Sequence, residues 1–410
     1  MNYINNISRA FKHRHYRNYF FFQFLSFTGT WLQSTAQSWL VYRLTDSALF
    51  LGVVSFAGTI PSLIFAPLSG VVSDKFKRKK ILITTQILCL IQGVIFASLF
   101  FTGTINEWHI VMLAIFLGVI NAFDVTARQS FIPLLISKED LVSGIAMNST
   151  MFNAARMIGP AIAGILIAVY SEGICFLLNV FSYIPMILFL FFVNEQEQVI
   201  KEFTSGFAYF KEGILFAWKN RPIRALLLLI GTYSFWGMSF SSLMPIFSEE
   251  ILHAGPKGLG LLVATSGIGA VLGGILLAGR KNILGVKRII AFCSVLFSVS
   301  LFLFAFSKSF FLSSFLLMLV GFCFMIVNAG SNTSLQAMSP DHLRGRIIGL
   351  YSTMFLGMFP LGALTIGFIA HNLGSQTAVA TGSIVCLVCA VYFSFNVKAL
   401  TKESKELLET

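Results

Sequence analysis

Three ionisable residues stand inside long apolar stretches of this 410-residue sequence, namely Asp124, Arg128 and Arg156. Asp124 and Arg128 are four residues apart with the acid first, which is the favourable order for an ion pair on one helix face. The other sixteen of the seventeen acidic residues fall in polar loops or at the ends of apolar stretches. Inside a lipid bilayer a charged side chain costs at least about 2.5 kcal/mol, so these three residues predict either pairing or a function.

Arg156 is expected near the middle of its apolar stretch, where an arginine cannot discharge itself by losing a proton. One interpretation pairs it with backbone carbonyls or a polar neighbour, which gives it a structural role only. The other assigns it to an anionic group of a bound solute, because a planar guanidinium can grip a carboxylate through two hydrogen bonds. Asn148 and Phe152, eight and four residues earlier, share its predicted helix face and join it as binding candidates.

A polar stripe runs along the first apolar stretch, at spacings of three and four residues. It consists of Gln23, Ser26, Thr30, Gln33 and Gln37. Facing lipid, such a stripe would be costly, so it predicts either the wall of a water-filled cavity or hydrogen bonding to other helices. We expect the cavity and count all five residues as binding candidates.

Polar, aromatic and methionine residues in the second half of the chain extend the predicted cavity. The candidates are Tyr233, Trp236, Asn328, Ser331, Asn332, Tyr351 and Met354. Aromatic and thioether surfaces suit a bulky amphiphilic solute, because they bury varied shapes without a fixed hydrogen-bond pattern. For any single aromatic residue, ordinary packing is the competing interpretation in a chain with 44 Phe.

Twelve apolar stretches of about 20 or more residues must position these side chains, and each is long enough to cross a bilayer as a helix. With 56% hydrophobic and 11% charged residues, the chain has too few charges to cover a water-soluble globule. The stretches are also much longer than the strands of a membrane barrel. The sequence therefore predicts an all-α membrane protein of twelve transmembrane helices, embedded in the lipid bilayer.

Basic residues indicate the side of the membrane on which each loop lies. If the N-terminus is cytoplasmic, inner segments hold all lysines and arginines except Arg43, Arg156, Lys257 and Lys308. This positive-inside distribution predicts that both termini are cytoplasmic, and it explains the net charge of +12 without nucleic acid. We expect no cleaved signal peptide, because the basic start leads into an apolar stretch that is too long for one.

The cysteines and histidines indicate neither metal binding nor catalysis. The six cysteines lie in or beside apolar stretches, and the CxxC pair, Cys386 and Cys389, has no second pair or helical histidine nearby. The six histidines lie in loops or at helix ends without matched acids. We therefore expect no metal, no cofactor and no enzyme, with a membrane-embedded transferase as a distant alternative.

A repeat divides the chain into two halves. The segment NAFDVTARQSFIP at 121–133 returns as NAGSNTSLQAMSP at 328–340, and the second copy lacks the acid and the arginine. The matching helices run in the same direction, which indicates two parallel six-helix repeats about an axis along the membrane normal. We expect an N-terminal bundle over 1–193, a cytoplasmic loop with an amphipathic helix over 194–222, and a C-terminal bundle over 223–410.

The loop GVVSDKFKRKK at 70–80 resembles the signature loop of the major facilitator superfamily. Lys77 stands where that superfamily usually has glycine, and the matching residues are Gly70, Asp74, Lys75, Arg78 and Lys79. The segment GPAIAG at 159–164 is similar to the glycine-proline signature of its antiporters. The first helix and NAFDVTARQSFIP resemble the third drug/proton antiporter family, which includes the enterobactin exporter and macrolide efflux pumps. This resemblance implies the major facilitator fold and export from the cytoplasm.

The resemblance also implies roles for single residues. In the superfamily the acid of the signature loop, here Asp74, joins an arginine at the inner end of the fourth helix, here Arg128, in a network that closes the cytoplasmic side. Asp124 is then a neighbour of this latch or, in the alternative, the carrier of the transported proton. Candidate pivots for alternating access, with close helix packing as the alternative, are Gly159, Pro160, Gly164, Pro360 and Gly362.

These features together predict a secondary active exporter of an amphiphilic small molecule, a siderophore-like metabolite or a drug, driven by proton antiport. The alternative is a transporter of lipid or another metabolite with the same fold and no proton coupling. We expect a monomer in the bacterial inner membrane, energised by the proton gradient. A hand-over of the substrate to a periplasmic or outer-membrane component is one expectation for its partners.

Overall fold

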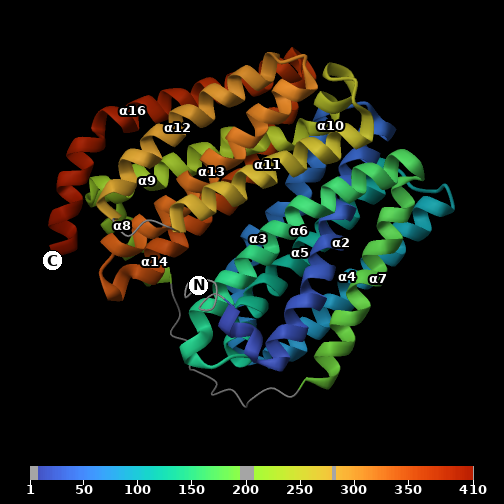
Figure 1. Ribbon diagram of the computed structural model, residues 1–410, viewed down its shortest axis with the longest axis horizontal. Helices are drawn as coiled ribbons and strands as arrows, with labels where there is room; N and C mark the ends of the chain where they lie inside the picture. Colours follow the sequence, from blue (N-terminus) through green and yellow to red (C-terminus); the bar gives the residue numbers. More distant parts are fainter. Residues whose placement is uncertain (1–7, 194–206, 279–282, 410) are drawn as a thin grey trace. The chain divides into compact units, whose positions relative to one another are not determined.

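The computed structural model describes residues 8–193, 207–278 and 283–409 (Figure 1). Nearly all of these residues are helical, and none of them lies in a strand. The prediction of an all-α membrane protein is therefore confirmed. Eleven helical spans in the described ranges are long and apolar enough to cross a membrane. Helix α2 (Arg14–Thr45), with 32 residues, is long enough to be a twelfth span, but its polar stripe makes it less apolar than those eleven.

The chain forms two compact units, each described here by itself. Unit 1 takes in the described residues of 1–46, 57–203 and 255–264, and unit 2 those of 47–56, 204–254 and 265–410. Helices α3 (Ala48–Lys75) and α11 (Gly255–Ala278) therefore begin in one unit and end in the other.

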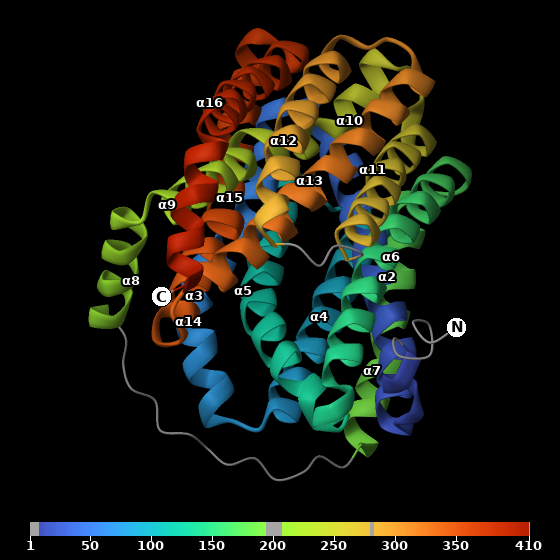
Figure 2. The ribbon, with the colours of Figure 1, turned by 60° about the vertical axis from the view of Figure 1, so that its left-hand side comes forward.

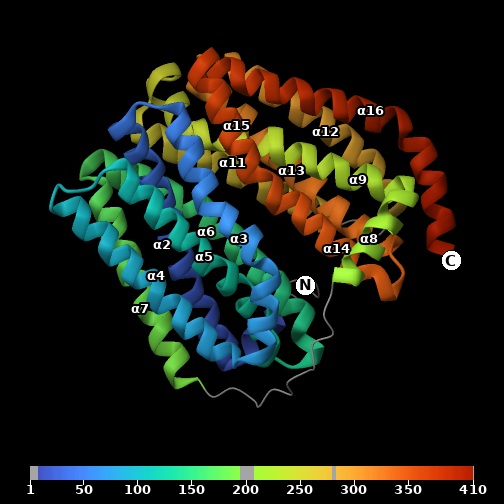
Figure 3. The ribbon, with the colours of Figure 1, turned by 180° about the vertical axis from the view of Figure 1, so that it is seen from behind.

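Unit 1 consists of long helices joined by short turns. Its remaining elements are η1 (Ser8–Lys12), α2 (Arg14–Thr45), α4 (Arg78–Phe101), α5 (Glu107–Phe131), η2 (Ile132–Leu134), η3 (Lys138–Asp140), α6 (Leu141–Val169) and α7 (Glu172–Phe192). Helix α2 packs against α6 and α7, and α4 packs against α5 and α7 (Figure 3). The start of α5 is fixed by Asn106, whose side-chain oxygen accepts a hydrogen bond from the backbone N–H of His109 at 2.9 Å.

An aromatic core closes one end of unit 1. The rings of Tyr16 and Tyr19 on α2 and Phe131 on α5 are almost fully buried there, with Leu82 of α4 and Leu190 of α7. This core fixes the C-terminal end of α5, the part that carries the acid and the arginine, because residues from α2, α4 and α7 pack around it.

Unit 2 contains two membrane spans that are not regular α-helices throughout. The first comprises α9 (Arg221–Thr232), the π-helix η4 (Tyr233–Met238), the 3-10 helix η5 (Ser239–Leu243), α10 (Met244–Ile246) and the π-helix η6 (Phe247–Ile251). The second comprises α14 (Asp341–Ser352), the π-helix η7 (Thr353–Gly357) and α15 (Met358–Leu373). Between these spans, Ser234 Oγ donates to the carbonyl of Phe355 and Ser239 Oγ donates to that of Phe359, so hydroxyls satisfy backbone groups where the helix is irregular.

The other helices of unit 2 are regular. They are α8 (Phe207–Lys219), α12 (Ile283–Phe306), α13 (Phe310–Met338) and α16 (Ser375–Glu409). Helix α12 packs along both α13 and α16, as Figure 2 shows. Helix α8 lies in the segment 194–222, where the sequence predicted a loop with a helix. Residues 194–206 of that segment lie outside the described residues, and α9 begins within it at Arg221.

Candidate functional site

Asp124 and Arg128 form an ion pair inside unit 1, as their spacing on α5 predicts. Arg128 Nε donates to Asp124 Oδ2 at 2.9 Å, and Nη2 of the same guanidinium donates to the same oxygen. Only 5% of Asp124 and 6% of Arg128 is exposed. The pair is therefore a buried charge pair, whose members depend on each other because neither is solvated by water.

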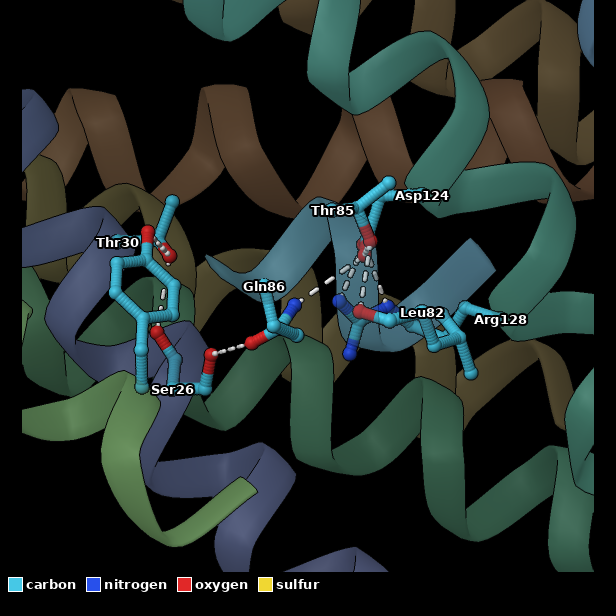
Figure 4. A network of polar contacts seen from close by, with 8 residues as sticks. Ser26, Thr30, Leu82, Thr85, Gln86, Asp124 and Arg128 are labelled. Atoms are coloured by element: carbon cyan, nitrogen blue, oxygen red, sulfur yellow. Dashed lines mark hydrogen bonds and ion pairs between the residues drawn. The ribbon is translucent and has the colours of Figure 1, made fainter. Parts of the chain in front are cut away.

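Two residues of α4 hold the second oxygen of the carboxylate (Figure 4). Thr85 Oγ1 donates to Asp124 Oδ1 at 2.7 Å, and Gln86 Nε2 donates to it at 3.2 Å. Both oxygens of Asp124 thus accept hydrogen bonds, and this set of donors suits the ionised acid. Sequence reasoning missed Thr85 and Gln86, although two adjacent polar residues within an apolar stretch are a signal that could have found them.

Part of the polar stripe of α2 faces the interior of unit 1. Ser26 Oγ donates to Gln86 Oε1 at 3.3 Å, and Thr30 Oγ1 lies 3.2 Å from the hydroxyl of Tyr183 on α7 (Figure 4). These contacts are hydrogen bonds between helices, which was the alternative to the expected cavity wall. The arrangement offers no support for contact between a solute and Ser26, because its side chain is enclosed by α2 and α4.

Gln33 continues the same interhelical bonding one turn further along α2. Its Nε2 donates to Gln92 Oε1 at 3.0 Å, and its Oε1 accepts from Asn179 Nδ2 at 2.7 Å. Gln23 is also fully buried, but neither end of its amide has a hydrogen-bond partner among the described residues. Gln37 is half-buried, so within the stripe it is the glutamine that remains partly accessible.

A second group of side chains surrounds Arg156 on the face that α2 and α6 share. The guanidinium carbon of Arg156 lies 5.6 Å from the ring centroid of Trp31. The ring of Phe152 stands edge-on to that of Phe27 at 5.2 Å and to that of Trp31 at 6.0 Å. Within the described residues Arg156 makes no ion pair, so its charge is stabilised by an aromatic face.

Arg156 and Phe152 remain accessible. Phe152 is 39% exposed and Arg156 is half-buried, and Asn148, two turns before Arg156 on α6, has a buried amide oxygen without a partner in the described part of the chain. Pro160 and Gly164 continue the same face of α6 toward the start of α11, where a side chain on Gly164 would meet the α-carbon of Gly260 at 3.0 Å. This face therefore points toward α11 within unit 1. A half-buried cation beside exposed aromatic carbon can bind an anionic, partly apolar solute.

The family profile of transmembrane secretion effectors matches residues 8–409 of the chain. The chain belongs to this family of the major facilitator superfamily. The protein is accordingly a multi-pass membrane transporter and not an enzyme.

Relatives and solved structures agree with this assignment. The transporter is similar to the staphyloferrin A transporter of Staphylococcus aureus, with 24% identity over 92% of this chain and 95% of the relative. Macrolide efflux protein A of Streptococcus pyogenes is 23% identical over 85% of this chain and 89% of the relative. A solved bacterial homologue of the iron transporter ferroportin, in an inward-facing state, has a TM-score of 0.70 at 16% identity, covering 95% of this chain and 98% of that one. That last likeness concerns the fold alone.

The signature loop of the transporter is described only in part. The side chain of Asp74 lies outside the described residues, so its expected network with Arg128 stays a prediction. Lys75 is exposed, Arg78 is half-buried, and no atom would meet a side chain at Gly70 within 4 Å. Lys79 Nζ donates to the carbonyls of Phe191 at 3.3 Å and Val193 at 2.7 Å, and thereby caps the last turn of α7.

Several candidates in unit 2 make contacts within that unit. The hydroxyl of Tyr233 donates to the carbonyl of Ser294 at 2.6 Å, and that of Tyr351 donates to Asn328 Oδ1 at 2.8 Å. Tyr233 is fully buried, so in this conformation it serves the packing of unit 2.

Four further unit 2 candidates differ in exposure. Ser331 is fully buried, Asn332 accepts from Gln336 Nε2 at 2.9 Å, and Met354 packs near Gly231. Trp236 is half-buried beside Phe235, with ring centroids 5.0 Å apart. Of these four, Trp236 and Met354 are the apolar side chains that keep some accessible surface.

The predicted pivots are places of close helix packing. A side chain at Gly159 would meet the β-carbon of Trp31 at 2.6 Å, and one at Gly362 would meet the carbonyl of Phe235. Pro160 and Pro360 are buried near these crossings, on α6 and α15. Small residues allow backbones to approach at such places, which is the alternative that the sequence left open. A hinge role stays a prediction.

The cysteines are unpaired in the described ranges. Five of them are buried, and Cys389 on α16 is half-buried. No group of three or more His, Cys, Asp or Glu side chains among the described residues is arranged to hold a metal ion.

Proposed function

We propose that this transporter is a secondary active exporter that exchanges an anionic, amphiphilic small molecule for protons by alternating access. The observation that carries the proposal is the buried Asp124, paired with Arg128 deep in unit 1. A buried charge pair is costly in a membrane protein, so its presence favours a role in the transport cycle over a role in stability alone. The names of the relatives, for staphyloferrin A and for macrolides, support export of this class of solute.

The surface formed by Arg156, Phe152 and Trp31, called here the Arg156 surface, supports the choice of solute. Its guanidinium has no anionic partner among the described residues and can bind a carboxylate through two hydrogen bonds. Phe152 and Trp31 beside it offer apolar area to the rest of the molecule. An anionic siderophore-like metabolite fits both features, whereas a neutral lipid would leave the arginine without a partner.

Protonation of Asp124 supplies a switch with two distinct arrangements. While Asp124 is ionised, Arg128 is held against it. A proton taken up from the outer side neutralises the carboxylate and removes the charge that holds Arg128, and release of that proton on the inner side restores the pair. Arg128 is the residue that the signature-loop network needs, so the same proton also controls the cytoplasmic latch.

We place this cycle in the bacterial inner membrane, with both termini in the cytoplasm. The positive-inside distribution of lysine and arginine supports that orientation. In this proposal the proton gradient is the energy source and the protein acts as a monomer, passing its substrate to a periplasmic or outer-membrane component.

Everted membrane vesicles test the proposal. Respiring vesicles that contain the protein are expected to accumulate staphyloferrin A or a macrolide, and a protonophore is expected to abolish the accumulation. Asp124→Asn is expected to lose at least ten-fold of the proton-driven uptake. Glu172→Gln is the matched control, because Glu172 is equally buried and paired with Arg43 at 2.8 Å but lies at a helix end.

Uptake that a protonophore leaves unchanged would reject proton coupling and favour the second candidate, a transporter of the same fold without proton antiport. Equal losses in Asp124→Asn and Glu172→Gln would show instead that a buried acid in unit 1 serves folding, and would remove Asp124 from the cycle.

A further inference from the structure

Phe27 on α2 stands between the Asp124–Arg128 ion pair and the aromatic group around Arg156. On one side, the guanidinium carbon of Arg128 lies 4.8 Å from the centroid of its ring. On the other side, the ring meets Phe152 edge-on at 5.2 Å, with an angle of 89° between the planes. No other described ring in the chain has such a double contact, with a buried ion pair and with the Arg156 surface.

The contacts continue from Phe152 to Arg156. The ring centroids of Phe152 and Trp31 are 6.0 Å apart, and the guanidinium carbon of Arg156 lies 5.6 Å from the ring centroid of Trp31. Phe27 and Trp31 are one helical turn apart on α2, and Phe152 and Arg156 are one turn apart on α6. We call Phe27, Phe152 and Trp31 the aromatic bridge.

We propose that Phe27 is a positioning residue that couples occupancy of the Arg156 surface to the proton-binding state of Asp124, through Phe152 and Arg128. This inference rests on the proposed function, and it adds the path by which solute binding and proton binding are coupled.

The coupling follows from the geometry of the bridge. Arg156 and Phe152 both contact the ring of Trp31, so in this proposal an anionic solute that binds Arg156 and lies on Phe152 shifts Phe152 relative to that ring. Edge-to-face aromatic pairs have a preferred geometry, so a shift of Phe152 also changes the position of Phe27. A cation is attracted to the face of an aromatic ring, so the guanidinium of Arg128 moves when the ring of Phe27 moves.

The proton step is the reversible protonation of one carboxylate. When Arg128 leaves Asp124 Oδ2, the carboxylate takes a proton from water and forms an O–H bond. When Arg128 returns, that bond breaks and the proton goes back to water. The other titratable groups facing Asp124 are Arg128 on its own helix, Tyr19 on α2, Cys89 on α4 and Tyr183 on α7. None of these four groups ordinarily titrates in the acidic range, in which a carboxyl group does.

Trp31 provides a reporter that needs no substrate. We would titrate the purified full-length protein in detergent from neutral to acidic pH and record the emission of Trp31, isolated by subtracting the spectrum of Trp31→Phe. Wild type is expected to show one transition, because loss of the Asp124 charge moves Arg128, Phe27, Phe152 and then Trp31. Asp124→Asn is expected to lose it.

Substitutions at Phe27 decide the inference. Phe27→Leu is expected to reduce the amplitude at least five-fold, and Phe27→Tyr, which keeps the ring, is expected to restore it. Phe22→Leu is the matched control, since Phe22 lies on the same helix and pairs with Phe189 at 5.9 Å without touching a cation. Size-exclusion profiles and thermal unfolding identify any variant that fails to fold. If Phe27→Leu fails to fold, Phe27→Tyr keeps the test decisive.

The possible results separate this inference from the proposed function. A full transition in Phe27→Leu, with none in Asp124→Asn, would overturn the role of Phe27 and leave the proton site in place. A transition that persists in Asp124→Asn would reject Asp124 as its source and so count against both. Absence of any transition in wild type would overturn the bridge, whereas proton-driven uptake in vesicles would still support the exporter.

Discussion

Buried amides on one face of α2 differ in whether they have hydrogen-bond partners. Gln33 bonds to Gln92 and Asn179, whereas Gln23, three turns nearer the start of the helix, has none among the described residues. An unpaired buried amide opposes folding, and a paired one supports it. The two glutamines therefore provide a comparison in which chemistry and helix are held constant.

Replacing each glutamine with leucine, which has a similar volume, is expected to have opposite effects. Gln23→Leu removes an unsatisfied group and is expected to raise the free energy of unfolding by about 1 kcal/mol. Gln33→Leu leaves Gln92 and Asn179 without their partner and is expected to lower it by about 1–3 kcal/mol. Thermal unfolding in detergent measures both. A loss of stability in Gln23→Leu would contradict the expectation and indicate that its amide has a partner in solution.

Sequence reasoning at this scale succeeded where the spacing was local and failed where the contact was distant. The ion pair of Asp124 and Arg128 follows from four residues on one helix. Thr85 and Gln86 are about forty positions away, and helical periodicity does not specify which neighbouring helix a face will meet. For the same reason the stripe of α2 allowed two interpretations, and the sequence did not specify the hydrogen bonds that Ser26 and Gln33 make to α4 and α7.

At the scale of elements, pairs of small residues set how closely helices approach. Gly164 of α6 faces Gly260 of α11 in unit 1, and Gly52 of α3 faces Gly367 of α15 in unit 2. A side chain at Gly52 would meet the carbonyl of Ala363 at 2.6 Å. Both crossings bring backbone against backbone, so a larger residue at either place must separate two helices.

Gly164→Leu is expected to destabilise the protein by about 1–3 kcal/mol, because the added atoms overlap the backbone of α11. Uptake in vesicles is expected to fall with it. Gly349→Ala on α14 is the control, since no atom lies within 4 Å of its added carbon, and it is expected to gain about 0.5–1 kcal/mol from the lower flexibility of alanine. Wild-type stability in Gly164→Leu would show that α6 and α11 can separate without cost.

Element types were more predictable than element regularity. Length and apolar composition predicted the membrane helices and a helix between the halves, which is α8. They did not predict the π-helices η4, η6 and η7, because a π-turn depends on partners such as Ser234 on a neighbouring span rather than on local propensity.

At the scale of the whole molecule, the two copies of the repeat have the same burial but different chemistry. Ser331 and Leu335 of α13, which correspond to Asp124 and Arg128, are fully buried in unit 2. The fold therefore accommodates uncharged residues at these positions, and the ion pair in unit 1 is not a requirement of the architecture.

This contrast predicts the behaviour of a double variant. Asp124→Ser combined with Arg128→Leu gives the first copy the residues of the second, and it is expected to fold with near wild-type stability while losing proton-driven uptake. Arg128→Leu alone leaves Asp124 buried without its cation and is expected to cost about 3–5 kcal/mol. Thermal unfolding and vesicle uptake measure the two effects. A double variant less stable than Arg128→Leu alone would contradict this interpretation.

The burial of the cysteines makes this chain well suited to spectroscopic labelling. Thiol reagents react with exposed thiolates, and five of the six cysteines are enclosed by helices. A single cysteine introduced at an exposed position, such as Gln129 beside the ion pair, can therefore carry a fluorophore or spin label against a low background. Motion at the C-terminal end of α5 can then be followed in real time without first removing the native thiols.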